Sequence, residues 1–323
     1  MAKVRFFWND PLDPDQVRLS WCAAFNRSIG TDTWSKVWNW RYQGNPLSEI
    51  PMAAYIIDNG MLACFYAVSP VYLITPQGSV IHSGLMNMGF THPEHQGKGF
   101  FQILNTELNN NLHSRGFNAI FGFANHNSHY AYRKYLRWTD IALLTNFELD
   151  ASHLRYLKTA DRAYQVSIVS IDDDLITRLE SYCVAEGKYY VARNREYLSW
   201  RIKNNPEHNY NGIGIHKGDG LVCCAIYKRY GDYEADIMEV FYQSVTGNHC
   251  DMLFMMSEYL VQLGFRKINI WSNLHSQEHL ELEKVGYRET FANTHFGVID
   301  FADNKGITDL RLWHYRFMDS DVY

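Results

Sequence analysis

The fold is decided by one stretch of sequence, Met88-Gly89-Phe90-Thr91-His92-Pro93-Glu94-His95-Gln96-Gly97-Lys98-Gly99-Phe100-Phe101. An apolar, strand-like run precedes it, and a helix with apolar residues at helical spacing follows it. Gly97 and Gly99 can adopt backbone conformations that other residues avoid. The N–H groups of the turn and of the first helical turn lack internal partners, and the helix dipole and Lys98 add positive charge. The pattern therefore predicts a strand, a turn and a helix start that bind a diphosphate.

Two common phosphate-binding loops do not fit this stretch. A Walker loop needs Lys-Ser/Thr after its last glycine, whereas Phe100-Phe101 follow here, and a dinucleotide fingerprint needs a third glycine. The stretch instead resembles motif A of the GNAT acyltransferase superfamily, Gln/Arg-x-x-Gly-x-Gly/Ala, which the run from Gln96 to Phe100 fits. Phe101 departs from that pattern, because the family usually has Gly or Ala there.

A second motif follows about thirty residues later, after another buried strand. Asn125, Ser128 and Tyr132 resemble GNAT motif B, which has an Asn at the end of strand five, a small residue three later and a Tyr seven later. The family usually ends this helix with Leu-Gly-Phe or Leu-Gly-Trp, whereas residues 135–138 read Tyr-Leu-Arg-Trp. The two motifs together imply a GNAT-type fold over residues 80–140.

Composition restricts the class of protein. Hydrophobic residues make up 46% of the 323 residues and charged residues 20%, which suits large folded cores. The net charge of −5 argues against broad affinity for nucleic acid. We find no apolar run of about 18 residues and no signal-peptide core, so the sequence predicts no membrane span. Six scattered cysteines without metal spacing are typical of a reduced, cytoplasmic protein.

The chain contains an internal repeat. The recurring pairs are Trp40–Pro46 with Trp200–Pro206, Gly116-Phe117 with Gly264-Phe265, and Asn125-x-x-Ser128 with Asn273-x-x-Ser276. Matches in constant order indicate a duplicated module with one shortened loop. We place the boundary near residue 150, which gives a catalytic module at 1–150 and a second module at 151–323. The predicted fold class is α/β, with two tandem GNAT-like modules, each a mixed, mostly antiparallel sheet flanked by helices.

Each half is expected to begin with helices and to continue with strands. The expected helices are Gln16–Asn26, Thr33–Tyr42, Leu175–Ala185 and Arg195–Ile202. The expected strands are Met52–Asp58, Met61–Ser69, Val71–Thr75, Tyr210–His216, Leu221–Arg229 and Glu234–Tyr242, with closing strands at Asn293–Ile299 and Leu310–Phe317.

The second half lacks the residues that are expected to bind the diphosphate and to donate a proton in the first half. Motif A shifted by the repeat spacing falls on Ser244–His249, where Val245 replaces a turn glycine. A β-branched residue strongly disfavours positive φ, so the diphosphate site should be lost. Tyr132 corresponds to Leu280, which carries no transferable proton. We therefore predict one acyl-CoA per chain and a degenerate second module that helps to form the acceptor site.

The GNAT resemblance implies transfer of an acyl group from acyl-CoA to a primary amine by direct attack in a ternary complex. It further implies that a bulge separates the strand-like run from Val80 to Phe90 from strand five, so that the pantetheine arm fits between them. A backbone N–H near Phe90 would then face the thioester oxygen. The residues expected to bind the cofactor are Gly89, Phe90, Thr91, Gln96, Gly97, Lys98, Gly99, Phe100, Phe101, Asn125 and Ser128.

Tyr132 is the expected acid that protonates the leaving thiolate, because a phenol of pKa about 10 can donate to it within hydrogen-bond reach. The base is less defined, since Leu85 stands where some GNAT enzymes carry a Glu. The titratable candidates for the base are His82, Glu94, His126 and His129, and we assign the role to His82. Ordered water is an alternative. The His-x-x-His pairs lack a supporting carboxylate, so no metal is expected.

Arg41 and Tyr42 are the expected acceptor-binding residues, with Arg41 able to meet a phosphate bidentately. The overall pattern resembles GNAT-type N-acyltransferases of bacterial surface-sugar pathways, which implies a dTDP-linked amino-deoxysugar as the acceptor. Two alternatives stay open: an acyl-CoA-binding sensor without turnover, and an aminoacyl-tRNA-dependent transferase with tandem GNAT-like modules. The sequence leaves the acyl chain length and the oligomeric state undetermined.

Overall fold

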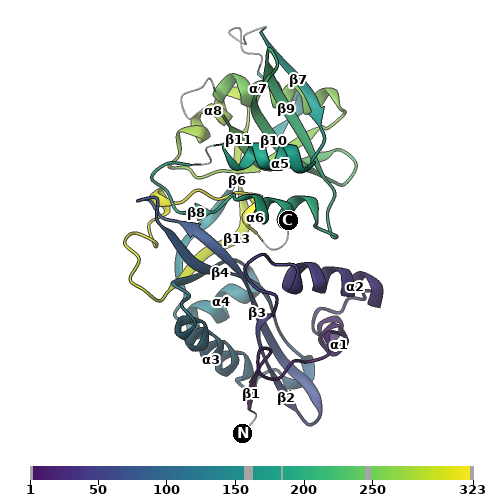
Figure 1. Ribbon diagram of the computed structural model, residues 1–323, viewed down its shortest axis with the longest axis vertical. Coiled ribbons are helices and arrows are strands. Elements are labelled where there is room, and N and C mark those ends of the chain that lie inside the picture. The colour runs from purple at the N-terminus through teal and green to yellow at the C-terminus, as the bar shows by residue number, and fades with distance from the viewer. Residues whose placement is uncertain (1–2, 156–162, 183–184, 244–248, 321–323) are drawn as a thin grey trace. The chain divides into compact units, whose positions relative to one another are not determined.

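The computed structural model describes residues 3–155, 163–182, 185–243 and 249–320 (Figure 1). The chain divides into two compact units. Unit 1 comprises Met1–Leu73, Val80–Ile141 and His295–Thr308, and unit 2 comprises Ile74–Ser79, Ala142–Thr294 and Asp309–Tyr323. Residues near the C-terminal end therefore return to the first unit.

Unit 1 is a sheet with helices on both faces (Figure 1). Its strands are β1 (Val4–Phe6), β2 (Met52–Asp58), β3 (Met61–Ile74), β4 (Val80–Thr91), β5 (Ala119–Asn125) and the second part of β13 (Arg288–Asp300), in that order across the sheet. Its helices are α1 (Pro14–Phe25), α2 (Thr31–Trp38), α3 (Phe100–Ser114) and α4 (His126–Tyr135). Strands β1 to β3 pair antiparallel, whereas β4 and β5 pair parallel.

Alternation along β2 and β3 explains why both faces of this sheet are covered. Ala54 and Tyr66 belong to a core that includes Leu104 and Leu108 of α3. Their strand neighbours Tyr55 and Phe65, on the opposite face, belong to a core with aromatic residues of α2. Because successive side chains of a strand point to opposite faces, a strand buried on both sides reads as a continuous apolar run.

Unit 2 has the same kind of architecture. Its strands are β6 (Thr139–Asp150), β7 (Tyr164–Val169), β8 (Tyr190–Val191), β9 (Tyr210–Lys217), β10 (Gly220–Tyr230), β11 (Glu234–Tyr242), β12 (Lys267–Trp271) and the first part of β13 (Arg288–Asp300). Its helices are α5 (Asp173–Glu180), α6 (Arg195–Leu198), α7 (His249–Gln262) and α8 (Gln277–Val285). The order β6-β12-β11-β10-β9-β7 runs across the sheet, and β11 and β12 are its parallel pair.

The repeated segments have the same local structure in both units. A π-helix covers Asn39–Gln43 and another covers Ser199–Lys203, at an offset of 160. The Oδ1 of Asn45 accepts the N–H of Leu47 at 2.8 Å, and Asn205 repeats this bond to Glu207 at 2.8 Å. Identical local hydrogen bonds at corresponding positions support the predicted duplication.

Most expected elements form, with three differences. The two strands expected at 61–69 and 71–75 are one strand, β3. The helix expected to reach residue 185 ends at Glu180, and residues 183–184 lie outside the described ones. The strand expected at Leu310–Phe317 is wrong: Leu310–Leu312 and Phe317–Asp319 are 3-10 turns, the first capped by the Asp309 side chain. No helix within the described ranges is long and apolar enough to cross a membrane.

Candidate active site

The turn between β4 and α3 has the backbone predicted from its glycines. Gly97 and Gly99 both have φ +75°, in the left-handed region, and a Cβ at either position would meet no atom within 4 Å. The requirement for glycine is therefore conformational rather than steric. The first intrahelical bond runs from Ile103 N to Gly99 O at 3.2 Å, and no side chain caps the helix start. The amides of the first turn of α3 are thus available to an anion.

Lys98 lies at this turn but is not an isolated charge. Its Nζ is 3.0 Å from Asp58 Oδ2 and 3.1 Å from His95 Nδ1. The hydrogen bond from Lys98 lowers the pKa of Asp58, which favours the carboxylate form of Asp58. The backbone amides are therefore the groups of the turn that an anion could reach without breaking an ion pair, and Lys98 would contribute to an anion site only by exchanging this partner.

Strands β4 and β5 separate after a short pairing. Only Ser83, Gly84 and Leu85 of β4 pair with β5 among the described residues, and the last pair is Leu85 with Phe121. Two hydrogen bonds mark the two ends of the pairing between β3 and β4, from Thr75 N to Ser79 O and from His92 N to Ala63 O. Between these bonds, the β4 side of the pairing has one residue more than the β3 side. One extra residue in β4 accounts for that difference, which is the definition of a bulge. The bulge and the separation expected from the GNAT resemblance are therefore present.

Strand alternation determines which backbone groups face the opening. His92 donates its N–H to Ala63 of β3 at 2.8 Å. In an extended strand, N–H groups two residues apart point to the same side, so Phe90 also faces β3. The backbone groups of Gly89 and Thr91 then face the opposite edge, toward β5. We therefore infer that the donor expected near Phe90 is supplied by one of its two neighbours.

An aromatic cluster surrounds Gly89. A Cβ at Gly89 would lie 3.2 Å from the Tyr66 ring and 3.5 Å from the Phe101 ring. Phe101 in turn stacks on Tyr132, with ring centroids 6.0 Å apart and planes 8° apart. Phe101 thus turns its ring toward the unit's interior, which leaves its amide at the helix start. The turn and Tyr132, predicted from separate motifs, are brought together through this ring.

Tyr66 is a residue of this cluster that the sequence did not single out. It is fully buried, and its hydroxyl has no hydrogen-bond partner among the described residues. Burial raises its pKa well above the ordinary value, and the nearby Tyr132 raises it further. One phenol among 22 tyrosines carries no sequence signal, although its position opposite Gly89 in a two-sided buried strand could have suggested it.

Asn125 and Ser128 close the start of α4. Asn125 Oδ1 accepts the N–H groups of Asn127 and Ser128, both at 3.0 Å, and Ser128 Oγ lies 3.3 Å from Asn125 O. These bonds identify Asn125 as the N-cap. The motif B residues therefore orient the helix that carries Tyr132, and the exposed Asn125 lies at the end of β5.

Tyr42 and Arg41 lie on the π-helix of unit 1. Tyr42 is buried, and its hydroxyl donates to Asn87 Oδ1 of β4 at 3.3 Å. Arg41 is half-buried, with its guanidinium 5.7 Å from the Trp40 ring centroid. Its counterpart Arg201 is buried and donates to backbone carbonyls, which gives it a structural role.

The base candidates do not gather at one place. His82 lies seven residues before Gly89 on β4, which is about 23 Å along an extended strand. It packs on Phe117 with ring centroids 4.0 Å apart, and burial lowers its pKa. His129, on α4 one turn before Tyr132, bonds Asp140 through Nε2 at 2.7 Å. The structure therefore does not place His82 near the turn.

One cluster in the described part of the chain could hold a metal ion. The ligand atoms of His92, Glu94 and His95 lie within 4.8 Å of one another. His92 Nδ1 already accepts the Glu94 N–H at 3.3 Å, and Lys98 Nζ lies 3.1 Å from His95 Nδ1. An ammonium group so close opposes a second cation, so we assign no metal to this cluster.

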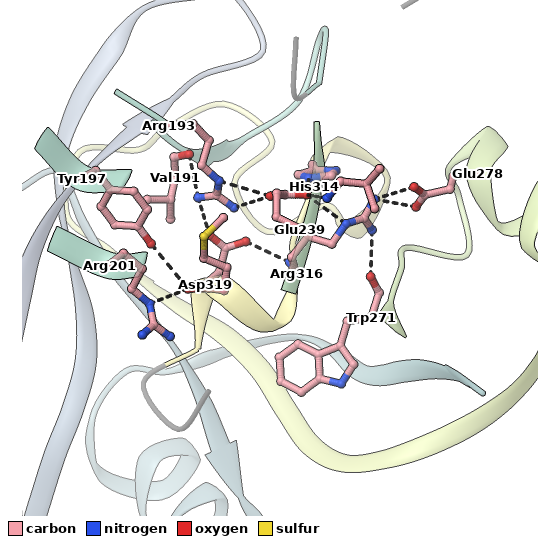
Figure 2. A network of polar contacts seen from close by, with 12 residues as sticks. Val191, Arg193, Tyr197, Arg201, Glu239, Trp271, Glu278, His314, Arg316 and Asp319 are labelled. Atoms are coloured by element: carbon pink, nitrogen blue, oxygen red, sulfur yellow. Dashed lines mark hydrogen bonds and ion pairs between the residues drawn. The ribbon is translucent and has the colours of Figure 1, made fainter. Parts of the chain in front are cut away.

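The corresponding opening in unit 2 is filled by its own side chains. Parallel pairing aligns Ala235 and Ile268 as it does Gly84 and Ile120, and β11 runs past the last pair as β4 does. Arg316 bridges this gap in Figure 2: Nε donates to Glu239 Oε1 at 3.1 Å and Nη1 to Trp271 O at 2.7 Å. Both ionisable side chains are almost completely buried.

Further charges complete this network. Arg316 Nη2 contacts both oxygens of Glu278 at 2.6 and 2.7 Å, and Arg193 Nη2 donates to Glu239 Oε2 at 2.8 Å (Figure 2). Burial opposes the ionisation of Glu239, but Arg193, His314 and Arg316 outweigh it and lower its pKa. An ion pair this deep persists because each charge is hydrogen-bonded.

The predicted loss of the turn in the second module falls on Ser244–His249, and residues 244–248, including Val245, lie outside the described ones. Leu280, the counterpart of Tyr132, lies on α8 and is 42% exposed. The described part of unit 2 thus lacks the phenol, and Arg316 fills its strand gap.

Comparison with known proteins identifies the fold. No protein-family model and no curated protein matches the sequence. The chain is similar to a conserved Enterococcus faecalis protein of unknown function described as a probable N-acyltransferase, with TM-score 0.71 and 12% identity over 94% of this chain and 73% of that one. It is similar to a GCN5-related N-acetyltransferase from Anabaena variabilis, with TM-score 0.67 and 13% identity over 92% and 72%.

A third similar structure is a GCN5-related glucosamine N-acetyltransferase region of a fungal multi-domain β-N-acetylglucosaminidase, with TM-score 0.59 and 14% identity over 93% of this chain and 38% of that one. In this chain the aligned region includes a mixed sheet with a parallel pair of strands and helices on its faces. The chain has the fold of the GCN5-related N-acetyltransferases.

Proposed function

We propose that the protein is an acyl-CoA-dependent N-acyltransferase whose active site lies in unit 1. The observation that carries the proposal is the turn at Gly97 and Gly99. Its left-handed glycines leave the first amides of α3 available, next to the point where β4 and β5 separate. A structural turn alone would not require an adjacent bulge and strand gap.

The residues present fit an acyl-CoA. The amides from Gly97 to Phe101 would hold its diphosphate, because uncapped helix starts bind anions. The backbone edge of Gly89 and Thr91 would hold the arm, and Asn125 and Ser128 fix the opposite side. Bound acyl-CoA would supply the acyl thioester.

Tyr132 is the proton donor in this proposal. Its ring lies against Phe101 at the start of α3, so it belongs to the same cluster as the turn. In the overall reaction a C–N bond forms, the C–S bond breaks, and a proton passes from the amine to the departing sulfur. Tyr132 would deliver the proton at sulfur, and water would accept the one lost by the amine. His82 takes no part, because it lies far along β4.

For the acceptor we propose a dTDP-linked amino-deoxysugar. Two observations support an amino sugar: the sequence resemblance to surface-sugar N-acyltransferases, and the similarity to a region named as a glucosamine N-acetyltransferase. Arg41 would contact the diphosphate of the acceptor, and Tyr42 would position β4 through Asn87. The contribution of residues 151–323 to the acceptor site stays a prediction.

The experiment is an acylation assay with purified protein and acetyl-CoA, in which products are identified by mass spectrometry. The acceptors are dTDP-4-amino-4,6-dideoxyglucose, its 3-amino isomer, free glucosamine and an aminoacyl-tRNA. We expect a product 42 Da heavier, the mass of an added acetyl group, with a dTDP sugar only. Acylation of glucosamine alone would retain the enzyme but exclude the nucleotide sugar. Absence of any product while CoA binds would favour the sensor alternative.

A further inference from the structure

The bulge of β4 can be located from the two cores of unit 1. Met86 belongs to the core that packs on α3, whereas Met88 belongs to the core with the aromatic residues of α2. Residues two apart in a regular strand point to the same face, so this change of face requires one inserted residue between them. The Nδ2 of Asn87 donates to Ser69 Oγ of β3, two residues after Ala67 of the α2 core. Asn87 and Met88 therefore form the bulge, with both side chains on the α2 face.

The side chain of Asn87 holds this bulge through three hydrogen bonds. Its Oδ1 accepts the N–H of Met88, the second residue of the bulge, and also the hydroxyl of Tyr42 at 3.3 Å. Its Nδ2 makes the bond to Ser69. Tyr42 and Ser69 are almost completely buried, and hydrogen bonds are stronger where water is excluded. The amide of Asn87 thus ties the bulge to β3 and to the π-helix of unit 1.

Unit 2 contains a second example of this arrangement. The pairing of β10 with β11 shifts after Ile226, where Met238 is the extra residue of β11. Glu239, the next residue, accepts the N–H of Val240 through Oε1 at 3.1 Å. In both units, therefore, a polar side chain of the bulge accepts the N–H of the residue that follows it. A neutral amide has this position in unit 1, and a carboxylate bonded to arginine has it in unit 2.

The bulge determines which backbone groups of β4 face β5. Gly89 follows the bulge directly, and its backbone faces β5 together with that of Thr91, because His92 donates to β3. Backbone groups alternate between the two edges of a strand, so moving the extra residue by one position would turn different groups toward β5. The amide of Asn87 is bonded to protein atoms at both its oxygen and its nitrogen. Asn87 would therefore affect a ligand through the backbone and not by direct contact.

We propose that Asn87 is a positioning residue for acyl transfer: it fixes the β4 bulge, so that the backbone edge of Gly89 and Thr91 faces the thioester. This role rests on the proposed function, because it requires acyl-CoA to lie between β4 and β5. Tyr42 acts together with Asn87, since its hydroxyl holds the amide from the π-helix. The diphosphate turn is a separate loop after β4, so the affinity for CoA would depend little on Asn87.

The first experiment compares Asn87→Leu with Asn87→Asp in the full chain. Leu removes all three hydrogen bonds, whereas Asp keeps an acceptor for Met88 and Tyr42 and can also accept from the Ser69 hydroxyl. We expect Asn87→Leu to lower kcat on the order of 10²-fold, because a small misplacement of reacting groups has an effect of that size. The calorimetric Kd for CoA should stay within about threefold. Asn87→Asp should restore kcat to within about tenfold of the wild type.

A second measurement does not depend on turnover. In ¹⁵N NMR spectra of the wild type, acetyl-CoA should shift the amide signals of Gly89 and Thr91. These shifts should be lost in Asn87→Leu and reduced in Tyr42→Phe, because their amides no longer face the ligand in a fixed direction. Tyr42→Phe removes only one of the three bonds, so it tests the same role if Asn87→Leu does not fold.

The matched control is Asn205→Leu in unit 2. Asn205 is also a buried amide, whose Oδ1 accepts a backbone N–H at 2.8 Å and whose Nδ2 donates to a tyrosine hydroxyl at 3.2 Å. This variant should lose stability as Asn87→Leu does, but it should keep kcat within about twofold and leave the two amide shifts unchanged.

Two results would overturn the role of Asn87. The first is an Asn87→Leu protein that binds CoA with the wild-type amide shifts at Gly89 and Thr91. The second is an equal loss of kcat in Asn87→Leu and Asn205→Leu, which would show a general loss of stability. A wild type that binds CoA but acylates no acceptor would overturn the proposed function alone, because the amide shifts still decide the role of Asn87. A wild type that binds no CoA would overturn both.

Discussion

Both units contain the same separation of two parallel strands, and the two copies differ in the side chains that lie at the gap. In unit 1, β4 leaves β5 after Leu85, and the turn beside the gap is shaped by two left-handed glycines. In unit 2, β11 leaves β12 after Ile237, and Arg316 bridges the gap from Glu239 to Trp271 O. The same strand arrangement thus occurs in both units, and in unit 2 the chain's own side chains fill the gap between the strands. The difference teaches that the opening is a property of the fold, whereas access to it depends on a few side chains.

The largest expected effect comes from a substitution in the glycine turn of unit 1. Gly97→Val places a β-branched residue at φ +75°, so the backbone should leave the left-handed region and turn the amides away. We expect CoA binding to fall below detection by calorimetry, with the far-UV circular dichroism unchanged because a Cβ there meets no atom. Gly218→Val, at φ +60° in unit 2, is the matched control and should bind CoA normally. Binding of two CoA molecules per wild-type chain would contradict the claim that only unit 1 binds CoA.

The next effect concerns the filled copy. Arg316→Met should lower the free energy of unfolding of unit 2 by about 3–5 kcal/mol, because it removes the only guanidinium bonded to Glu278 among the described residues and leaves the buried Glu239 with Arg193 and His314 alone. Urea titration followed by hydrogen exchange of unit 2 peptides measures the loss. Arg311→Met is the control on the same segment, since Arg311 is exposed and its guanidinium pairs with Asp309, a partly exposed side chain. Equal free energies of unfolding of the two variants would show that Arg316 occupies the gap without stabilising unit 2.

A smaller effect tests the chemistry of the open copy. Tyr132→Phe should lower kcat on the order of 10²-fold with little change in CoA affinity, because proton donation matters mainly in the transition state. Tyr130→Phe, two residues earlier on the same helix and 64% exposed, should be neutral. His82→Gln should change kcat less than twofold, given its place on β4. Unchanged turnover of Tyr132→Phe, with chemistry shown to be rate-limiting, would remove this phenol from the mechanism.

Local requirements are what the sequence by itself determined. A left-handed turn needs glycine, so Gly97 and Gly99 could be assigned before the structure. Motif B identified Asn125, which the structure shows to be the N-cap of α4. Asn273 keeps a bond of the same local kind, because its Oδ1 accepts the N–H of His275 two residues later. The sequence also predicted a duplication, and the matching hydrogen bonds of Asn45 and Asn205 agree with that prediction. Each of these features depends on residues within a few positions of one another.

Long-range placement was decided only by the tertiary structure. Glu239 lies 46 residues from Arg193 and 77 from Arg316, and no local pattern connects them. The same holds for Tyr66, which reaches Gly89 only because β3 and β4 pair. His82 shows the converse, since it is close to Gly89 in sequence but lies about 23 Å from it along the extended strand. A buried charge or phenol depends on which strands meet, and that choice is made by the packing of the whole unit.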